Sequence, residues 1–103
     1  MSWEIAVRPA AQDDITNAAD WYENERRGLG TAFVGAVRAA IASLAENPHR
    51  FAIRNRRRQA RWFYTHRFPY RIVYLPLSAT VIIVAVLLAA RHDREWRKRL
   101  ASD

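Results

Sequence analysis

The chain has 103 residues, half of them apolar and 12% aromatic, so we expect one domain built around a single core. It contains no cysteine, which excludes disulfides, thiolate zinc sites and cysteine nucleophiles. The opening Met-Ser-Trp-Glu lacks the basic and apolar regions of a signal peptide. The longest apolar stretch, residues 77–90, is shorter than the ~20 residues that span a bilayer. We therefore expect a cytoplasmic protein with no membrane partner.

The formal net charge of +7 is concentrated in one segment. Residues 1–49 carry 4 basic and 7 acidic side chains, whereas residues 50–71 carry 8 arginines and no acid. Arginine binds phosphate or carboxylate oxygens with two N–H groups at once, and like charges without a partner repel each other. The segment therefore predicts a polyanionic or strongly acidic partner, the alternative being a solvated basic face. The eight are Arg50, Arg54, Arg56, Arg57, Arg58, Arg61, Arg67 and Arg71.

The first residues predict a strand followed by a helix. Apolar side chains alternate over residues 3–7, which indicates a short strand with one buried face formed by Trp3, Ile5 and Val7. Pro9 suits the first turn of a helix, and the apolar spacing that follows predicts an amphipathic helix over residues 10–25. Asp13 and Asp14 are expected to interact favourably with the dipole of this helix.

Two glycines, Gly28 and Gly30, break the first helix, and a second helix is predicted from residue 31 to Asn47-Pro48. A connection this short predicts that the two helices form an antiparallel hairpin. The buried side of the second helix is expected to contain Phe33, Val37, Ala40, Ile41 and Leu44.

The second half of the chain is rich in aromatic and β-branched residues, which favour strands. The last of these strands is apolar on both faces, as in a central strand that is covered on both sides. The predicted segments are an extended piece at 51–53, strands at 60–66 and 70–75, a turn at 76–78, a central strand at 80–88 and a helix at 93–100.

The order β-α-α-β-β-β with a short C-terminal helix predicts an α+β, two-layer domain. In this fold the N-terminal helical hairpin packs on a mostly antiparallel sheet. Residues 1–103 form the single domain, with the first strand and the hairpin in residues 1–48 and the basic sheet in residues 49–103. Trp62 is expected in the core, and Trp96 is expected to pack the terminal helix onto the sheet.

One catalytic constellation is compatible with these residues. Cleavage of RNA through its 2′-hydroxyl needs no metal, only an acid, a base and cations around the phosphate. If the last two strands pair as a hairpin, Arg71 and His92 lie at one edge of the sheet. Tyr64, Tyr70 and Tyr74 would then be available to stack on bases. The alternative is that the aromatic rings are core residues and that His92 makes a structural hydrogen bond.

Several segments in a fixed order cover nearly the whole chain: Pro9-Ala10-Ala11, Trp21-Tyr22, Gly28-Leu29-Gly30, Glu46-Asn47-Pro48, residues 68–74 and residues 84–99. In this order they resemble the RelE/ParE superfamily of toxins from type II toxin–antitoxin systems. RelE-like members cleave ribosome-bound mRNA and often use a C-terminal tyrosine, whereas ParE-like members poison DNA gyrase. This chain has one lysine, Lys98, and no tyrosine after Tyr74, and its C-terminal segment resembles the ParE-like, plasmid-stabilisation branch.

The resemblance implies a gyrase poison that requires no cofactor and no metal. It also implies a cognate ParD-like antitoxin that folds on binding and assembles with the toxin into a heterotetramer or larger complex. Two alternatives stay open: a ribosome-dependent mRNA endonuclease, in which Arg71 and His92 are catalytic, and a plain nucleic-acid-binding module. The residues expected to bind the target or the antitoxin are Arg54, Arg56, Arg57, Arg58, Arg61, Arg67, Tyr70, Arg94, Trp96 and Arg99.

Overall fold

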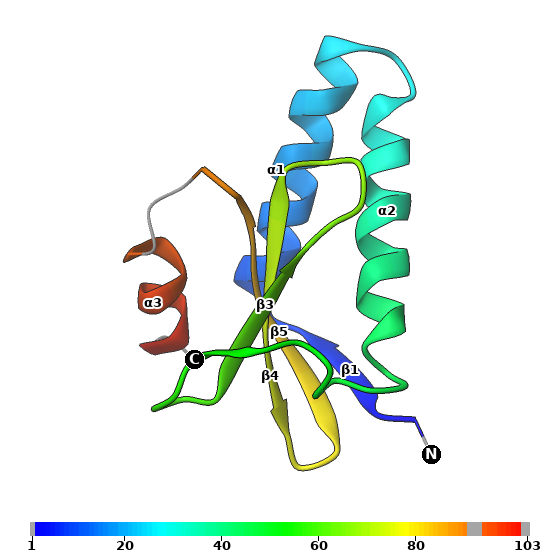
Figure 1. The fold of residues 1–103 in the computed structure, drawn as a ribbon. Coiled ribbons are helices and arrows are strands. Elements are labelled where there is room, and N and C mark those ends of the chain that lie inside the picture. The colour runs from blue at the N-terminus through cyan, green and yellow to red at the C-terminus, as the bar shows by residue number, and fades with distance from the viewer. Residues whose placement is uncertain (1, 91–93, 102–103) are drawn as a thin grey trace.

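The computed structural model describes residues 2–90 and 94–101, which form a five-stranded sheet and three helices (Figure 1). The predicted α+β class is confirmed, since a helical hairpin packs on a mostly antiparallel sheet. The elements are β1 (Glu4–Val7), α1 (Pro9–Glu25), α2 (Leu29–Ser43), β2 (Ile53–Asn55), β3 (Ala60–Tyr64), β4 (Tyr70–Leu77), β5 (Thr80–Leu88) and α3 (Arg94–Ala101).

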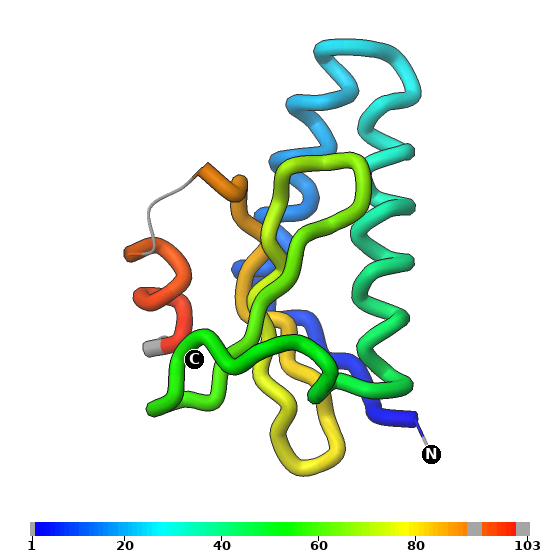
Figure 2. The backbone as a smooth tube through the Cα atoms, in the orientation of Figure 1, coloured from blue at the N-terminus to red at the C-terminus, as the bar shows by residue number. Residues whose placement is uncertain are grey.

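The sheet has the strand order β1-β5-β4-β3-β2, and the path of the chain through it can be followed in Figure 2. β1 pairs with β5 in parallel, and the other neighbours are antiparallel. A parallel pair needs a long crossover, and here α1 and α2 lie between β1 and the rest of the sheet in the sequence. β2 is a further strand beyond the predicted order, and it begins two residues later than the extended piece predicted at 51–53.

The predicted central strand at 80–88 coincides with β5, whereas β4 is longer than the predicted 70–75. β4 continues through Pro76 to Leu77, and the turn is made by Ser78 and Ala79, with φ of 51° and 66°. The register between β3 and β4 ends at Tyr74, so no β3 partner requires an N–H from the proline.

A β-bulge in β5 decides which side chains face which helices. Val73 of β4 pairs with Ala85, and Tyr74 pairs with Ile83, so Val84 is the extra residue. Val84 and Ala85 consequently pack on the same side of the sheet, while Ile83 packs with α1 and α2 on the other.

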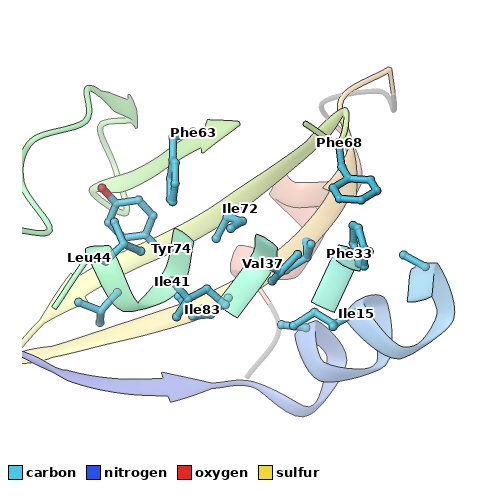
Figure 3. Packing of buried hydrophobic residues seen from close by; sticks show 14 residues of the cluster. Ile15, Phe33, Val37, Ile41, Leu44, Phe63, Phe68, Ile72, Tyr74 and Ile83 are labelled. Atoms are coloured by element: carbon cyan, nitrogen blue, oxygen red, sulfur yellow. The ribbon is translucent and has the colours of Figure 1, made fainter. Parts of the chain in front are cut away.

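The helical hairpin covers one side, which we call the hairpin face of the sheet. Phe33 and Val37 of α2 and Tyr74 of β4 are fully buried there, and Figure 3 shows them together with Ile15 of α1. The rings of Phe33, Tyr22, Phe68 and Tyr70 meet at centroid distances of 5.0 to 6.1 Å, mostly edge to face or tilted.

Tyr74 anchors the loop that follows α2. Its hydroxyl donates a 2.7 Å hydrogen bond to the carbonyl oxygen of Pro48, and its side chain is fully buried. Burial removes water from the phenolate and raises the pKa of Tyr74 to about 12, although the nearby Arg61 and Arg50 act in the opposite direction. Tyr74 is therefore a core residue, and the expectation that it would be available to stack on bases is wrong.

The α1–α2 connection depends on two glycines. Gly28 has a φ of 86°, which favours glycine, and Gly30 lies so close to α1 that a Cβ there would be 2.5 Å from the carbonyl oxygen of Ala19. The Glu23 carboxylate accepts hydrogen bonds of 2.9 Å from the N–H groups of both glycines, and these bonds lower the pKa of Glu23.

Two predicted details near the N-terminal half were wrong. α2 ends at Ser43 and does not reach residue 47, because the N–H groups of Leu44 and Ala45 donate to the carbonyl oxygens of Ile41 and Ala42, three residues earlier, in a tighter turn. The carbonyl oxygen of Ala45 then accepts a 2.8 Å bond from the N–H of Trp3, just before β1. Trp3 and Ile5 pack against the core as predicted, but Val7, at the end of the edge strand, remains 37% exposed.

Candidate functional site

The second side of the sheet is covered by α3, and we call it the α3 face (Figure 1). Trp96 and Leu100 of α3 are both only 3% exposed, as expected for a helix that Trp96 packs onto the sheet. They contact a small apolar cluster on the sheet, made of Ala60, Val73, Leu75, Val84, Ala85 and Leu87.

A network around Asp14 holds α3 in place. The Arg99 guanidinium donates bonds of 2.7 and 2.9 Å to the two oxygens of Asp14, which raises the pKa of Arg99. The Asp14 carboxylate also accepts a 3.0 Å bond from the N–H of Val86, on the edge of β5 beyond the end of its pairing with β1. Arg8 donates to the carbonyl oxygen of Arg99 at 3.2 Å. Asp14 therefore joins α1, β5 and α3, in place of the dipole role that we expected.

Trp62 is the centre of a stack of cations and rings on β3. The guanidinium carbons of Arg54 and Arg71 lie 4.3 and 4.9 Å from the Trp62 ring centroid, and they come from the strands on either side of β3. Tyr64 lies edge-on to Trp62 at 5.3 Å and is 57% exposed. Trp62 is half-buried against the α3-face cluster, so the prediction of a core residue holds only in part.

The densest part of the arginine segment is the turn between β2 and β3. Arg56, Arg57 and Arg58 are all exposed there. The turn is held by hydrogen bonds from the Arg58 N–H to the Asn55 side chain and from the Gln59 side chain to the carbonyl oxygen of Arg56. Ala60, which directly follows the turn, packs in the same cluster as α3, so these arginines project beside the α3 face.

Other predicted binding residues already make contacts within the fold. Arg61 donates to the carbonyl oxygens of His49 and Phe51 at 3.1 and 2.6 Å, and thereby fixes the loop after α2. Tyr70 lies in the aromatic cluster of the hairpin face, 5.0 Å from Phe33 between ring centroids. Trp96 is core, and Arg99 bonds Asp14.

Arg67 and Arg94 are exposed. Arg67 has a φ of 78° in the β3–β4 loop, and its guanidinium carbon lies 5.3 Å from the Phe68 ring centroid. Arg94 is the first residue of α3. The exposed members of the predicted set are therefore Arg54, Arg56, Arg57, Arg58, Arg67 and Arg94.

Of the two residues predicted to be catalytic in the ribonuclease alternative, Arg71 and His92, the structure describes only Arg71. β4 and β5 pair as predicted, with Arg71 opposite Leu87, so the start of one strand lies beside the end of the other. Arg71 is only 6% exposed, and its guanidinium donates a 3.3 Å bond to the carbonyl oxygen of Ala89. His92 lies outside the described residues.

A hollow of about 430 Å³ lies beside the edge of β3. It was not predicted, although the aromatic residues interspersed in the arginine segment were a signal for it. Its walls include Arg50, Phe51, Arg54, Trp62, Tyr64 and His66. Among residues 2–90 and 94–101, no group of three or more His, Asp or Glu side chains is placed to hold a metal ion. None of the helices in this same part of the chain is long and apolar enough to cross a membrane.

A sequence model for the family described as "ParE toxin of type II toxin-antitoxin system, parDE" matches residues 5–93, most of the chain. The chain belongs to this family. No curated protein matches the sequence. The basic turn between β2 and β3, the stack around Trp62 and the helix α3 are therefore features of a ParE-family toxin.

Solved structures agree with this fold. One is "Chromosomal ParDE TA system from P. aeruginosa", which has a TM-score of 0.74 at 13% identity, over 84% of this chain and 96% of that chain. A mutant of the E. coli toxin RelE in the free state has a TM-score of 0.69 at 13% identity, over 98% of this chain and 96% of that chain. At this identity the two likenesses show the shared fold alone. One of these structures is of a ParDE system and the other is of RelE.

Proposed function

We propose that this toxin inhibits growth in the cytoplasm by binding DNA gyrase and trapping its cleaved DNA. The observation that supports this most is the match to the ParE family over residues 5–93. The proposed inhibition requires binding only, and the burial of Arg71 does not favour its use as a catalytic residue. Its guanidinium is buried between the Trp62 ring and the Ala89 carbonyl oxygen, so a phosphate would have to displace these contacts to reach it.

The exposed arginines are the residues that we assign to the target. Arg56 and Arg57 project from the β2–β3 turn, and Arg54 and Arg94 lie on the same side of the sheet as α3 or on α3 itself. Because residues 50–71 contain no acid, this surface attracts acidic or phosphate-rich surfaces over a distance of about a Debye length.

We further propose a cognate antitoxin as the second partner. The similar P. aeruginosa structure is that of a ParDE system, and the present chain offers arginines that carboxylates of an antitoxin can neutralise. An antitoxin segment that folds on binding must bury apolar area to offset its ordering entropy, and the ring surfaces of Trp62 and Tyr64 provide some of it. Assembly into a heterotetramer or larger complex is part of this proposal.

The test is a cleavage assay with purified toxin, gyrase, supercoiled plasmid and ATP. Protein-linked linear DNA should accumulate with the toxin and disappear when the antitoxin is added in excess. A toxin preparation that stops growth in cells but yields no linear DNA would contradict gyrase as the target and would direct the search to the ribosome and mRNA.

A further inference from the structure

The hollow beside β3 exists because β2 is short. The pairing of β2 with β3 ends at Ile53 and Arg61, so the following residues of β3, Trp62 to Tyr64, border the hollow of about 430 Å³. A volume of this size lies within the usual range of small-ligand sites, roughly 300–1,000 Å³.

The walls of the hollow include aromatic rings, and two of these rings, Phe51 and Trp62, are packed against other side chains of the fold. Phe51 stacks on the buried Phe63 with a centroid distance of 4.3 Å and an interplanar angle of 9°. Trp62 is fixed by the guanidinium groups of Arg54 and Arg71. Tyr64 is different, because it contacts Trp62 only edge-on and exposes 57% of its surface. Its ring is therefore the aromatic surface most available to a ligand.

Cations stand at the rim of the same hollow. Arg54 lies over Trp62, and Arg50 is held over Phe51 with its guanidinium carbon 4.8 Å from the ring centroid. Arg50 also donates to the Ser43 hydroxyl at 3.0 Å, which fixes its position. The sequence from residue 50 to residue 71 contributes no carboxylate that would oppose an anion.

We propose that this hollow binds an unstacked base of a single-stranded nucleic acid. The base stacks on Tyr64, and the flanking phosphates contact Arg54 and Arg50. The inference goes beyond the proposed action on gyrase and does not depend on it.

The combination of groups favours nucleic acid over an acidic peptide. The carboxylates of an acidic peptide would be bound by the arginines, and the ring of Tyr64 would contribute to binding a peptide only by covering its apolar side chains. Every base, by contrast, has a flat face that stacks on an aromatic ring, and a phosphate lies on each side of it. A base within a duplex remains stacked on its neighbours, so the site should prefer single strands.

The experiment measures binding by fluorescence anisotropy of a labelled oligothymidylate of about ten nucleotides. This length lies within the roughly 4–16 nucleotides that single-strand-binding domains cover. The oligothymidylate annealed to its complement serves as the duplex, and an oligouridylate of equal length compares RNA with DNA. Tyr64→Ala should weaken single-strand binding about 5- to 150-fold, the loss of one base–ring stack. Tyr64→Phe, which keeps the ring, should retain the affinity.

The arginine part of the proposal has its own readout. Arg54→Ala should reduce the slope of log affinity against log salt by about 0.7, the value for one phosphate on a single strand. Arg27→Ala removes the same charge from the exposed α1–α2 connection and should leave both affinity and slope as in the wild type.

Three results would overturn the proposal. The first is that the toxin binds the duplex as tightly as the single strand and that Tyr64→Ala binds with the affinity of the wild type. This result would indicate electrostatic attraction alone. The second is no binding of either oligonucleotide at low salt. The third is binding of an oligoglutamate that depends on Tyr64 while the oligonucleotides do not bind, which assigns the hollow to an acidic peptide.

Discussion

The two faces of the sheet are built in different ways. The hairpin face is closed by two long helices over large aromatic and branched side chains, and the buried Tyr74 hydroxyl donates its hydrogen bond inside the protein. The α3 face is covered by one helix of eight residues over a smaller cluster. Beside that helix lie the exposed arginines of the β2–β3 turn and the ring of Tyr64.

The difference between the two faces indicates that the residues that stabilise the fold are largely distinct from those that are available to bind partners. Arg61 contributes to the fold, since its guanidinium fixes the loop after α2. Arg56 and Arg57, which lie only a few residues away in the sequence, project from a turn into solvent. The hairpin face therefore provides most of the stability, and the α3 face presents most of the cations to partners.

The largest effect is expected in the hairpin face. Phe33→Ala removes a fully buried ring that contacts three other aromatic rings, and should lower the free energy of unfolding by about 3–5 kcal/mol. Urea denaturation measures the loss. Trp21→Ala removes a ring that is 57% exposed, and its effect should stay within about 0.5 kcal/mol. Equal losses for the two variants would show that the buried aromatic cluster of the hairpin face is not a main source of stability.

The second effect is on alkaline stability. Tyr74 has a pKa of about 12 in the fold against 10.0 in the unfolded chain, so the unfolded state loses this proton first. Stability is therefore retained below pH 10 and falls as the pH rises towards 12, by at most about 1.4 kcal/mol per pH unit from this group. Burial raises the pKa of Tyr22 too, and adds in the same direction.

Urea denaturation at about pH 9 and about pH 11.5 tests this, since the two values lie on either side of the onset of tyrosine titration. Tyr74→Phe is less stable at the lower pH, because the Pro48 carbonyl oxygen loses its partner, but it should lose less stability between the two pH values. A loss as steep as that of the wild type would show that Tyr74 does not cause the effect.

The third effect concerns α3 alone. Asp14→Asn weakens the bonds to Arg99 and should lower the protection of the α3 amides against hydrogen exchange by about 1–3 kcal/mol. Amides of α2 should keep their protection, since the hairpin face does not depend on this contact. Asp13→Asn makes the same change of charge at an exposed neighbour that makes no hydrogen bond to Arg99, and should have a much smaller effect. Loss of protection throughout the chain would contradict the separation of the two faces.

A pair of glycines gives effects of opposite sign. Gly30→Ala places a Cβ 2.5 Å from the Ala19 carbonyl oxygen, so α1 and α2 must move apart, at a cost of about 1–3 kcal/mol. Gly35→Ala meets nothing within 4 Å and lies inside α2, so it should stabilise by about 0.5–1 kcal/mol. Thermal denaturation of both variants compares them, and a tolerated Gly30→Ala would show that the helices do not need this close approach.

Local patterns predicted the elements well where a segment has one strong signal. Thr80 to Leu88 is apolar on both faces, and β5 has these bounds because the hairpin covers one side and α3 the other. The end of α2 and the bulge at Val84 were not predictable in this way. The bulge depends on the pairing of β5 with β4, and the turn after α2 is held by the distant Trp3, whose N–H donates to the carbonyl oxygen of Ala45.

The candidate site shows the same limit. Composition alone located the arginine segment, because eight cations without an acid are a strong signal. It did not distinguish Arg61, whose partners are backbone oxygens twelve and ten residues earlier, from Arg57 in the exposed turn. Asp14 was also misread, since a residue near a helix start gives no sign that it bonds a strand N–H 72 residues later.

The most direct test of whether the α3 face binds gyrase compares two double variants in the gyrase cleavage assay. Arg56→Ala with Arg57→Ala removes two exposed charges beside the α3 face, and Arg26→Ala with Arg27→Ala removes two exposed charges from the α1–α2 connection. We expect wild-type toxin and the second variant to accumulate protein-linked linear DNA, while the first variant accumulates severalfold less and remains folded. Equal accumulation with both variants would contradict binding through the α3 face, and no accumulation with a wild-type toxin that stops growth would contradict gyrase as the target.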